Sequence, residues 1–253
     1  MKRALLAAAA AALLSGCASS SKKMPSSELY LTERMATVFL QQGNAMEAEP
    51  AFKKVLADDP DNAEMRDGHG LSLLMLGRPK EALAEFDHAL KIAPKESYLN
   101  NRGVAKMQLG DFPGAEADFL KAYESPNMAD RQSALINLGR VRMRRGLPGE
   151  AEEAFSRALV IVPDSYEGLM ARGEAREALK NEKGAVEDYL SALKVKPDDL
   201  DALLHVGMGL LALNNSDLGQ RYLRRVAELA PESPQAARAR LILGEGSNVE
   251  LPQ

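Results

Sequence analysis

A pattern of small and aromatic residues recurs along this chain about every 34 residues, and it constrains the fold more than any other feature. In a typical copy a small residue is followed by Gly or Asn after seven positions, by Ala after five more, and by an aromatic residue after a further four. A second small residue and then a proline complete the copy. The clearest copy consists of Gly70, Gly77, Ala82, Phe86, Ala89 and Pro94. A unit this short cannot enclose a core of its own, so we expect the copies to stack side by side.

Six copies of the pattern fill most of the chain. Their aromatic positions are held by Phe52, Phe86, Phe119, Phe155 and Tyr189, and in the least regular copy by Leu223. Gly at position 8, Ala at 20 and 27, an aromatic at 24 and Pro at 32 resemble the signature of tetratricopeptide repeats. The resemblance implies two antiparallel helices in each copy. The predicted fold is therefore all-α: a tetratricopeptide-repeat superhelix of six helix-turn-helix repeats over 29–231, followed by a C-terminal capping helix and tail over 232–253.

The chain begins with a sequence typical of exported proteins. Two basic residues precede an apolar run over 4–14, which is too short to span a bilayer as a helix. The small pair Ser15 and Gly16 then stands directly before Cys17, the only cysteine of the chain. Residues 1–16 are therefore predicted to be a cleaved lipoprotein signal peptide.

The placement of Cys17 resembles the lipobox of bacterial lipoproteins. The resemblance implies that its thiol carries a diacylglycerol thioether and that its new amino terminus is acylated. Two or more lipid chains hold a protein stably on a membrane. The next residue is Ala18, which is not acidic. In such lipoproteins, a residue that is not acidic at this position favours the outer membrane. We therefore expect residues 17–28 to be a lipidated cysteine and flexible tether at the periplasmic face of the outer membrane. The alternative is a secretory signal that ends beside an unrelated cysteine.

The charge and residue types of the chain argue against several functions. The chain has 32 Lys and Arg against 36 Asp and Glu, and it therefore lacks the basic excess that nucleic-acid binding calls for. Its three histidines, His69, His88 and His205, show no spacing typical of metal ligands, and no glycine run resembles a phosphate-binding loop. We expect His69 and His205 to pack between helices or to be partly exposed. The sequence predicts no catalytic residue, no metal, no small-molecule substrate and no cofactor besides the covalent lipid, so the protein is not expected to be an enzyme.

What remains is the concave side of the stack, which the first helix of each tetratricopeptide repeat lines. The resemblance places positions 2, 5, 9, 12 and 13 of each repeat in this groove. In the second and third repeats they select the apolar residues Leu71, Leu74, Met75, Val104 and Met107. In the fourth they select Arg140, Met143 and Arg144, and in the fifth Glu167, Met170, Glu174 and Glu177. We predict that the apolar residues of the second and third repeats, together with the three residues of the fourth, bind a partner polypeptide. The alternative for any one residue is that it is solvated surface or packs within the protein.

A lipobox, a short tether and six regular repeats within about 250 residues resemble the type IV pilus pilotin family of PilF, PilW and Tgl, with Tgl closest in layout. The resemblance implies an outer-membrane lipoprotein that binds secretin subunits and promotes their localisation and multimerisation, for pilus assembly and pilus-dependent motility. The implied partners are secretin subunits and, through the lipid, the outer membrane. The alternative is an adaptor lipoprotein of another envelope machine, serving outer-membrane barrel insertion, a Flp-type pilus or regulation of a cell-wall synthase.

Overall fold

The computed structural model describes residues 24–245, which form thirteen α-helices and no strand. They are α1 (Ser26–Gln41), α2 (Ala45–Asp58), α3 (Ala63–Met75), α4 (Pro79–Ile92), α5 (Glu96–Gln108), α6 (Phe112–Ala122), α7 (Met128–Arg144), α8 (Pro148–Ile161), α9 (Tyr166–Ala178), α10 (Glu182–Val195), α11 (Leu200–Ala212), α12 (Ser216–Leu229) and α13 (Pro234–Leu243). Successive helices pair into six repeats, and α13 is added at the end. The predicted all-α superhelix of six repeats with a capping helix is confirmed. None of these helices is long and apolar enough to cross a membrane.

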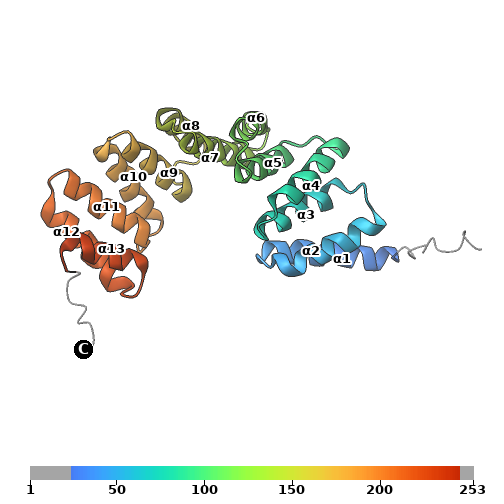
Figure 1. Cartoon of the computed structure of the whole chain (residues 1–253), viewed down its shortest axis with the longest axis horizontal. Coiled ribbons are helices and arrows are strands. Elements are labelled where there is room, and N and C mark those ends of the chain that lie inside the picture. The colour runs from blue at the N-terminus through green and yellow to red at the C-terminus, as the bar shows by residue number, and fades with distance from the viewer. Residues whose placement is uncertain (1–23, 246–253) are drawn as a thin grey trace, which may run out of the picture.

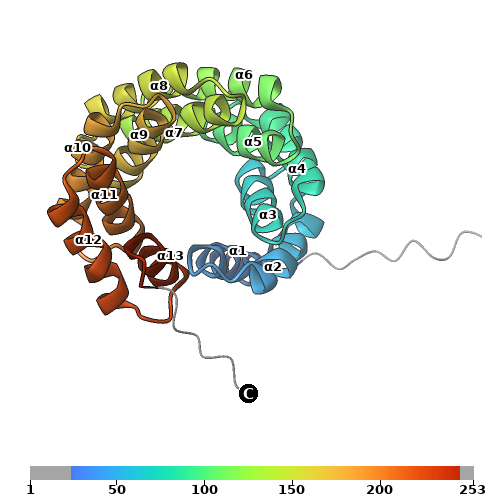
Figure 2. The ribbon, with the colours of Figure 1, turned by 60° about the vertical axis from the view of Figure 1, so that its left-hand side comes forward.

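The stack of helices is strongly curved. It forms an arch in Figure 1, and in Figure 2 it surrounds a central opening. The first helix of each repeat lies on the inner side of the curve and the second helix on the outer side (Figure 2). Inner helices contact their inner neighbours, as α3 does with α5 and α5 with α7, whereas an outer helix such as α4 packs between the inner helices α3 and α5. The inner helices therefore supply the concave surface of the molecule.

In most repeats the two helices meet where an aromatic ring rests on a glycine. The rings of Phe86 and Phe119 are fully buried, and they lie against Gly70 and Gly103 in the first helices of their own repeats. A Cβ atom added to these two glycines would stand 2.5 and 2.6 Å from a ring carbon. A larger side chain there would push the helices apart. The recurrence of positions 8 and 24 in the sequence is thus a packing requirement inside each repeat.

The turns within the repeats need a left-handed backbone. In four repeats a glycine with a φ between 71° and 82° makes this turn, namely Gly43, Gly77, Gly110 and Gly146. In the fifth and sixth repeats Lys180 (φ 62°) and Asn214 (φ 60°) take the same conformation. Asn enters this region readily, whereas Lys does so rarely. The turn at Lys180 is therefore set by the packing of α9 on α10 rather than by the local sequence.

The two ends of the stack are defined by their capping residues. Helix α1 begins at Ser26, which lies inside the segment 17–28 that was expected to be a tether. Pro25, directly before the helix, has an extended backbone (φ −55°, ψ 143°). The predicted signal peptide and Cys17 lie outside the described residues. Helix α13 follows Ser233, whose hydroxyl accepts a backbone N–H of the first turn, and it stops at Gly244 with a φ of 75°. Ser at the N-cap and Gly with a left-handed backbone at the C-terminal end are typical of α-helices.

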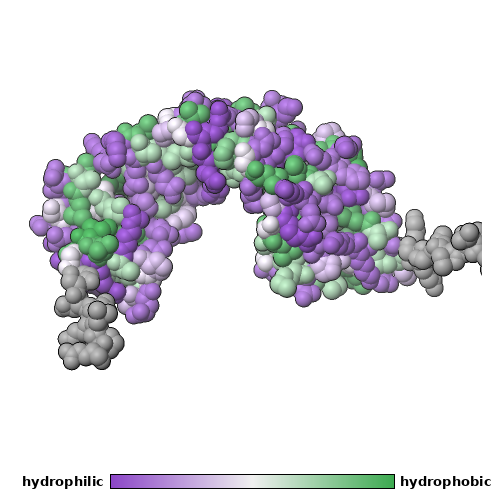
Figure 3. Space-filling view, viewed as in Figure 1, coloured by the Kyte–Doolittle hydropathy of each residue, from purple (hydrophilic) through white to green (hydrophobic). Residues whose placement is uncertain are grey.

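The C-terminal end of the arch carries exposed apolar side chains. Leu241 of α13 is 75% exposed, and Ile242 and Leu229 are also exposed. Figure 3 shows hydrophobic side chains over α12 and α13 on the face in view. A terminal repeat usually presents a polar outer face. The capping helix therefore covers α12 without making this end wholly hydrophilic.

A buried carboxylate joins the two helices of the fifth repeat. Asp188 of α10 is 3% exposed and accepts hydrogen bonds from Arg172 Nη2 (2.6 Å) and Nε (2.9 Å) and from Arg176 Nη1 (2.9 Å), both arginines lying on α9. Arg176 Nε also donates to Glu152 of α8 at 2.8 Å. Asp118 of α6 holds the same place between two cations of α5. These ion pairs fix the outer helices on the inner ones, and hence the shape of the groove.

Candidate binding groove

The inner face of the first three repeats holds an apolar hollow of about 400 Å³. It is lined by Leu40 of α1, by Leu71, Leu74 and Met75 of α3, and by Val104 and Gln108 of α5. Met75 is 52% exposed, and the leucines and Val104 are half-buried. In Figure 3, hydrophobic side chains are visible on the inner side of the arch over α3 and α5. These six residues are termed the apolar hollow.

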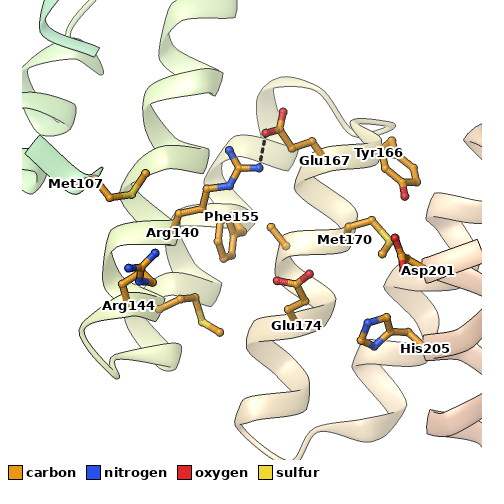
Figure 4. A pocket seen from close by; sticks show the side chains of 12 residues that line it. Met107, Arg140, Arg144, Phe155, Tyr166, Glu167, Met170, Glu174, Asp201 and His205 are labelled. Carbon is orange, nitrogen blue, oxygen red and sulfur yellow. Dashed lines mark ion pairs between the residues drawn. The ribbon is translucent and has the colours of Figure 1, made fainter. Parts of the chain in front are cut away.

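A second hollow, of about 620 Å³, lies farther along the inner face and has charged walls (Figure 4). Its lining comprises Met107, Arg140, Met143, Arg144, Phe155, Tyr166, Glu167, Met170, Ala171, Glu174, Asp201 and His205. Helix α7 supplies the arginines, α9 the two glutamates, and α11 the aspartate and the histidine. These residues are termed the charged hollow.

The eight residues predicted from the sequence to bind a partner each line one of these two hollows, whereas Glu177, which the repeat register also placed in the groove, lines neither. Leu71, Leu74, Met75 and Val104 come together in the apolar hollow, whereas Met107, Arg140, Met143 and Arg144 line the charged hollow. Met107 thus separates from the apolar set with which it was grouped. Three residues along a helix amount to a rotation of about 300°, so Met107 points about 60° away from Val104 and toward α7. That these residues bind a partner remains a prediction.

Sequence reasoning missed part of the charged hollow. Asp201 stands at position 2 of the sixth repeat, so the repeat register could have selected it. His205 was expected to pack between helices, and it does stack on the buried ring of Tyr189, with ring centres 4.8 Å apart. It also lines the hollow, and the sequence did not assign it to the groove. Tyr166, at the start of α9, had no signal in the sequence.

Opposite charges face each other across the charged hollow. Arg140 Nη2 forms an ion pair with Glu167 Oε1 at 2.5 Å, and the two side chains are 45% and 53% exposed. The guanidinium of Arg144 lies 5.7 Å from the centre of the Phe112 ring. No carboxylate of residues 24–245 lies within 4 Å of it. The α7 wall is therefore cationic, and the wall made by α9 and α11 is acidic.

His205 lies beside the acidic side chains of the α9 wall. Its Nδ1 lies 3.0 Å from Glu177 Oε1. This hydrogen bond raises the pKa of His205, although burial acts in the opposite direction. Burial raises the pKa of Glu174, and the nearby His205 partly opposes that shift. The protonated form of His205 is thus favoured beside the acidic side chains.

Asp67 is a partly buried carboxylate on the inner helix α3. Its two oxygens accept hydrogen bonds from Asn101 Nδ2 of α5 at 2.9 and 3.1 Å. Burial raises the pKa of Asp67 from 3.8 to about 6, even though the Asn101 hydrogen bond and the charge of Lys95 lower it. At neutral pH Asp67 is therefore ionised, but its carboxylate is less stable in the folded chain than in the unfolded chain.

Asp67→Asn is expected to stabilise the fold at pH 7 by about 1 to 3 kcal/mol. The contribution of Asp67 to stability is full below the unfolded pKa of 3.8 and is lost as the pH rises through about 6. Asparagine has no charge to desolvate, and its amide oxygen can still accept from Asn101. Urea denaturation followed by circular dichroism should show the gain at pH 7 and little at pH 4. Asp61→Asn, at a side chain that is 81% exposed, should show neither. An equal gain at both pH values would contradict this assignment.

The groove offers surfaces for binding. Among residues 24–245, no three His, Cys, Asp or Glu side chains come together as a metal-ion site. His69 is buried with its Nδ1 3.3 Å from Glu85 Oε1, as a packing role predicts. That the protein is no enzyme and needs no cofactor stays a prediction.

Proteins of similar sequence share the repeats over part of their length. The DnaJ homolog subfamily C member 7 homolog of Schizosaccharomyces pombe is 27% identical over 190 residues, covering 69% of this chain and 39% of that protein. The type IV pilus assembly protein PilF of Pseudomonas aeruginosa is 27% identical over 122 residues, covering 48% of each. In sequence, the chain thus matches less than half the length of these two relatives.

Solved structures match more of the chain. Pseudomonas aeruginosa PilF superimposes with a TM-score of 0.72 at 20% identity, covering 85% of this chain and 97% of PilF. PilW, a type IV pilus biogenesis factor, superimposes with a TM-score of 0.76 at 20% identity, covering 85% and 98%. At this identity the likeness shows the fold. The model of the tetratricopeptide repeat matches residues 34–97, 100–166 and 137–202. These matches cover more than half of the residues of this chain, and the chain therefore belongs to the tetratricopeptide repeat family.

Proposed function

We propose that this protein is an adaptor of type IV pilus assembly that holds an apolar segment of a secretin subunit in its groove and promotes secretin multimerisation at the outer membrane. The apolar hollow is the observation that carries the proposal, because it presents Leu71, Leu74, Met75 and Val104 together on the concave face. The likeness to PilF and PilW over nearly the whole length of those chains supports the assignment to pilus biogenesis.

The apolar hollow suits a segment that later enters a bilayer or a subunit interface. An unassembled secretin subunit exposes such segments, and exposed apolar surface favours association. Burying one leucine or phenylalanine side chain contributes about 1.5 to 3 kcal/mol. Met75 can adapt its flexible thioether to different side chains. The hollow can therefore shield an apolar segment without demanding one sequence.

The lipid predicted on Cys17 supplies the place of binding. Eight residues lie between Cys17 and the first residue of α1, and this connection reaches at most about 30 Å. A groove held this close to the outer membrane raises the local concentration of its partner there. Attachment and recognition thus act together in the proposed mechanism.

Met75→Glu is expected to reduce secretin multimers in cell envelopes at least tenfold, because it places a charge in the apolar hollow. The matched control is Met46→Glu on the outer helix α2, where the side chain is 77% exposed. Met75 is itself 52% exposed, so both variants should keep their thermal stability. Multimers would be measured by immunoblotting, together with secretin that co-purifies with the chain. Normal multimers in the Met75→Glu strain would reject the hollow as the secretin site.

A deletion strain separates the two kinds of envelope machine. Loss of pili and of secretin multimers, with other outer-membrane proteins unchanged, is the expected result. A broad loss of outer-membrane proteins would instead indicate barrel insertion and overturn the proposal.

A further inference from the structure

We infer that the charged hollow is a second binding site, for a stretch of partner polypeptide that carries an acidic residue and a basic residue on opposite sides of an apolar side chain. The inference rests on the proposed function only in taking the partner to be a polypeptide. It concerns a different part of the groove from the apolar hollow. The two hollows share no residue.

The arrangement of charges determines the kind of ligand. Figure 4 shows Arg140 and Arg144 extending from α7 on one side and Asp201 and His205 lying on the other, with Met170 between them. A ligand with one sign of charge would be attracted by one wall and repelled by the other. A ligand with both signs, correctly ordered, is attracted by both walls.

Charged groups on both walls are available to a ligand. Arg144 has no carboxylate within 4 Å among residues 24–245, and over the same range Glu174 forms no ion pair. Asp201 accepts one hydrogen bond, from the neutral side chain of Gln235 at 2.9 Å. A ligand can therefore bind these groups without breaking an internal ion pair.

The ion pair between Arg140 and Glu167 can yield to a ligand. Both side chains are about half exposed, and pairs at such sites contribute about 0 to 1 kcal/mol. An acidic ligand residue could therefore replace Glu167 on Arg140 at little cost.

Three methionines supply the apolar part of the hollow. Met107, Met143 and Met170 come from α5, α7 and α9 and all line it. Thioethers adapt to side chains of different shape. The charges would thus select the order of the ligand's ionic residues, and the methionines would accept a variable residue between them.

Direct binding of synthetic peptides to the full-length chain in detergent tests this inference. Three short peptides share one Leu-Met centre and differ in their ends, which are acidic and basic, both acidic or both basic. Fluorescence anisotropy should show the peptide of mixed ends binding at least tenfold more tightly than either other peptide.

Variants of the walls should change the preference in opposite directions. Arg144→Glu should lower the affinity for the peptide of mixed ends about tenfold and raise the affinity for the peptide with two basic ends. Glu174→Lys should also lower the affinity for the peptide of mixed ends about tenfold, and it should raise the affinity for the peptide with two acidic ends. Arg224→Glu, an equal change at an exposed arginine of the outer helix α12, should leave all three affinities unchanged.

Several results would overturn the inference. One is affinity that does not depend on the peptide ends, and another is loss of binding through Met75→Glu rather than Arg144→Glu. A dimer of the unliganded chain that Arg144→Glu dissociates would show a second copy as the occupant. Since no secretin is present in this assay, its outcome is separate from that of the proposed function.

Discussion

Replacing Asp188 by alanine is expected to lower the free energy of unfolding by about 3 to 5 kcal/mol. The variant leaves Arg172 and Arg176 without the carboxylate that they share, whose side chain is 4% exposed. The stranded guanidinium groups keep their desolvation penalty and lose the attraction that offset it. Because each repeat contacts only its neighbours, faster hydrogen exchange should appear first in α9 and α10. Urea denaturation and hydrogen exchange would measure both effects.

Two further variants separate the charge from the packing around Asp188. Arg172→Met combined with Asp188→Leu removes the carboxylate together with its bidentate partner, while Arg176 keeps Glu152 at 2.8 Å. We expect this double variant to recover more than half of the loss, since apolar residues can replace a buried ion pair at little cost. Glu152→Ala removes a partner that is 27% exposed and should cost about 1 kcal/mol or less. If Asp188→Ala cost no more than Glu152→Ala, burial of the carboxylate would be irrelevant.

The sequence could predict the repeats because each repeated position has a steric role. The positions of Gly70 and Phe86 recur at a fixed spacing because an aromatic ring packs against a helix backbone at each of them. Asp188 could not be predicted in this way. In the sequence it is one of many acidic residues on helices, where solvated surface is the usual role. Its two cations lie on the preceding helix, and only the folded pair of helices brings them together.

The two hollows differ in the same respect. The apolar residues of α3 and α5 belong to adjacent repeats, so the helical register alone brings Leu71, Leu74 and Val104 together. The charged hollow joins residues from α5 to α11. Which of those residues meet depends on how far the stack curves between them, and the repeat pattern does not specify curvature. This is why the sequence did not assign His205 to the groove.

Replacing Cys17 by serine is expected to remove the protein from the outer membrane completely. Lipid attachment requires the thiol, and a serine hydroxyl does not substitute for it in the lipobox that Cys17 resembles. Each buried methylene of an acyl chain contributes about 0.8 kcal/mol to membrane binding, so losing all the chains abolishes stable attachment. Fractionation of envelopes followed by immunoblotting would measure the change, and mass spectrometry of the mature terminus would show whether the lipid is present.

Ala18→Asp is the matched control for this prediction, because it keeps the lipid and changes only the residue that follows Cys17. It should move the protein to the inner membrane without releasing it. Both variants should lose secretin multimers in cells, while the purified Cys17→Ser protein should still bind secretin segments in solution, since its groove is unaltered. If Cys17→Ser stayed in the outer membrane and multimers formed normally, lipid attachment would have no part in the mechanism, and the groove alone would have to bring the protein to the secretin.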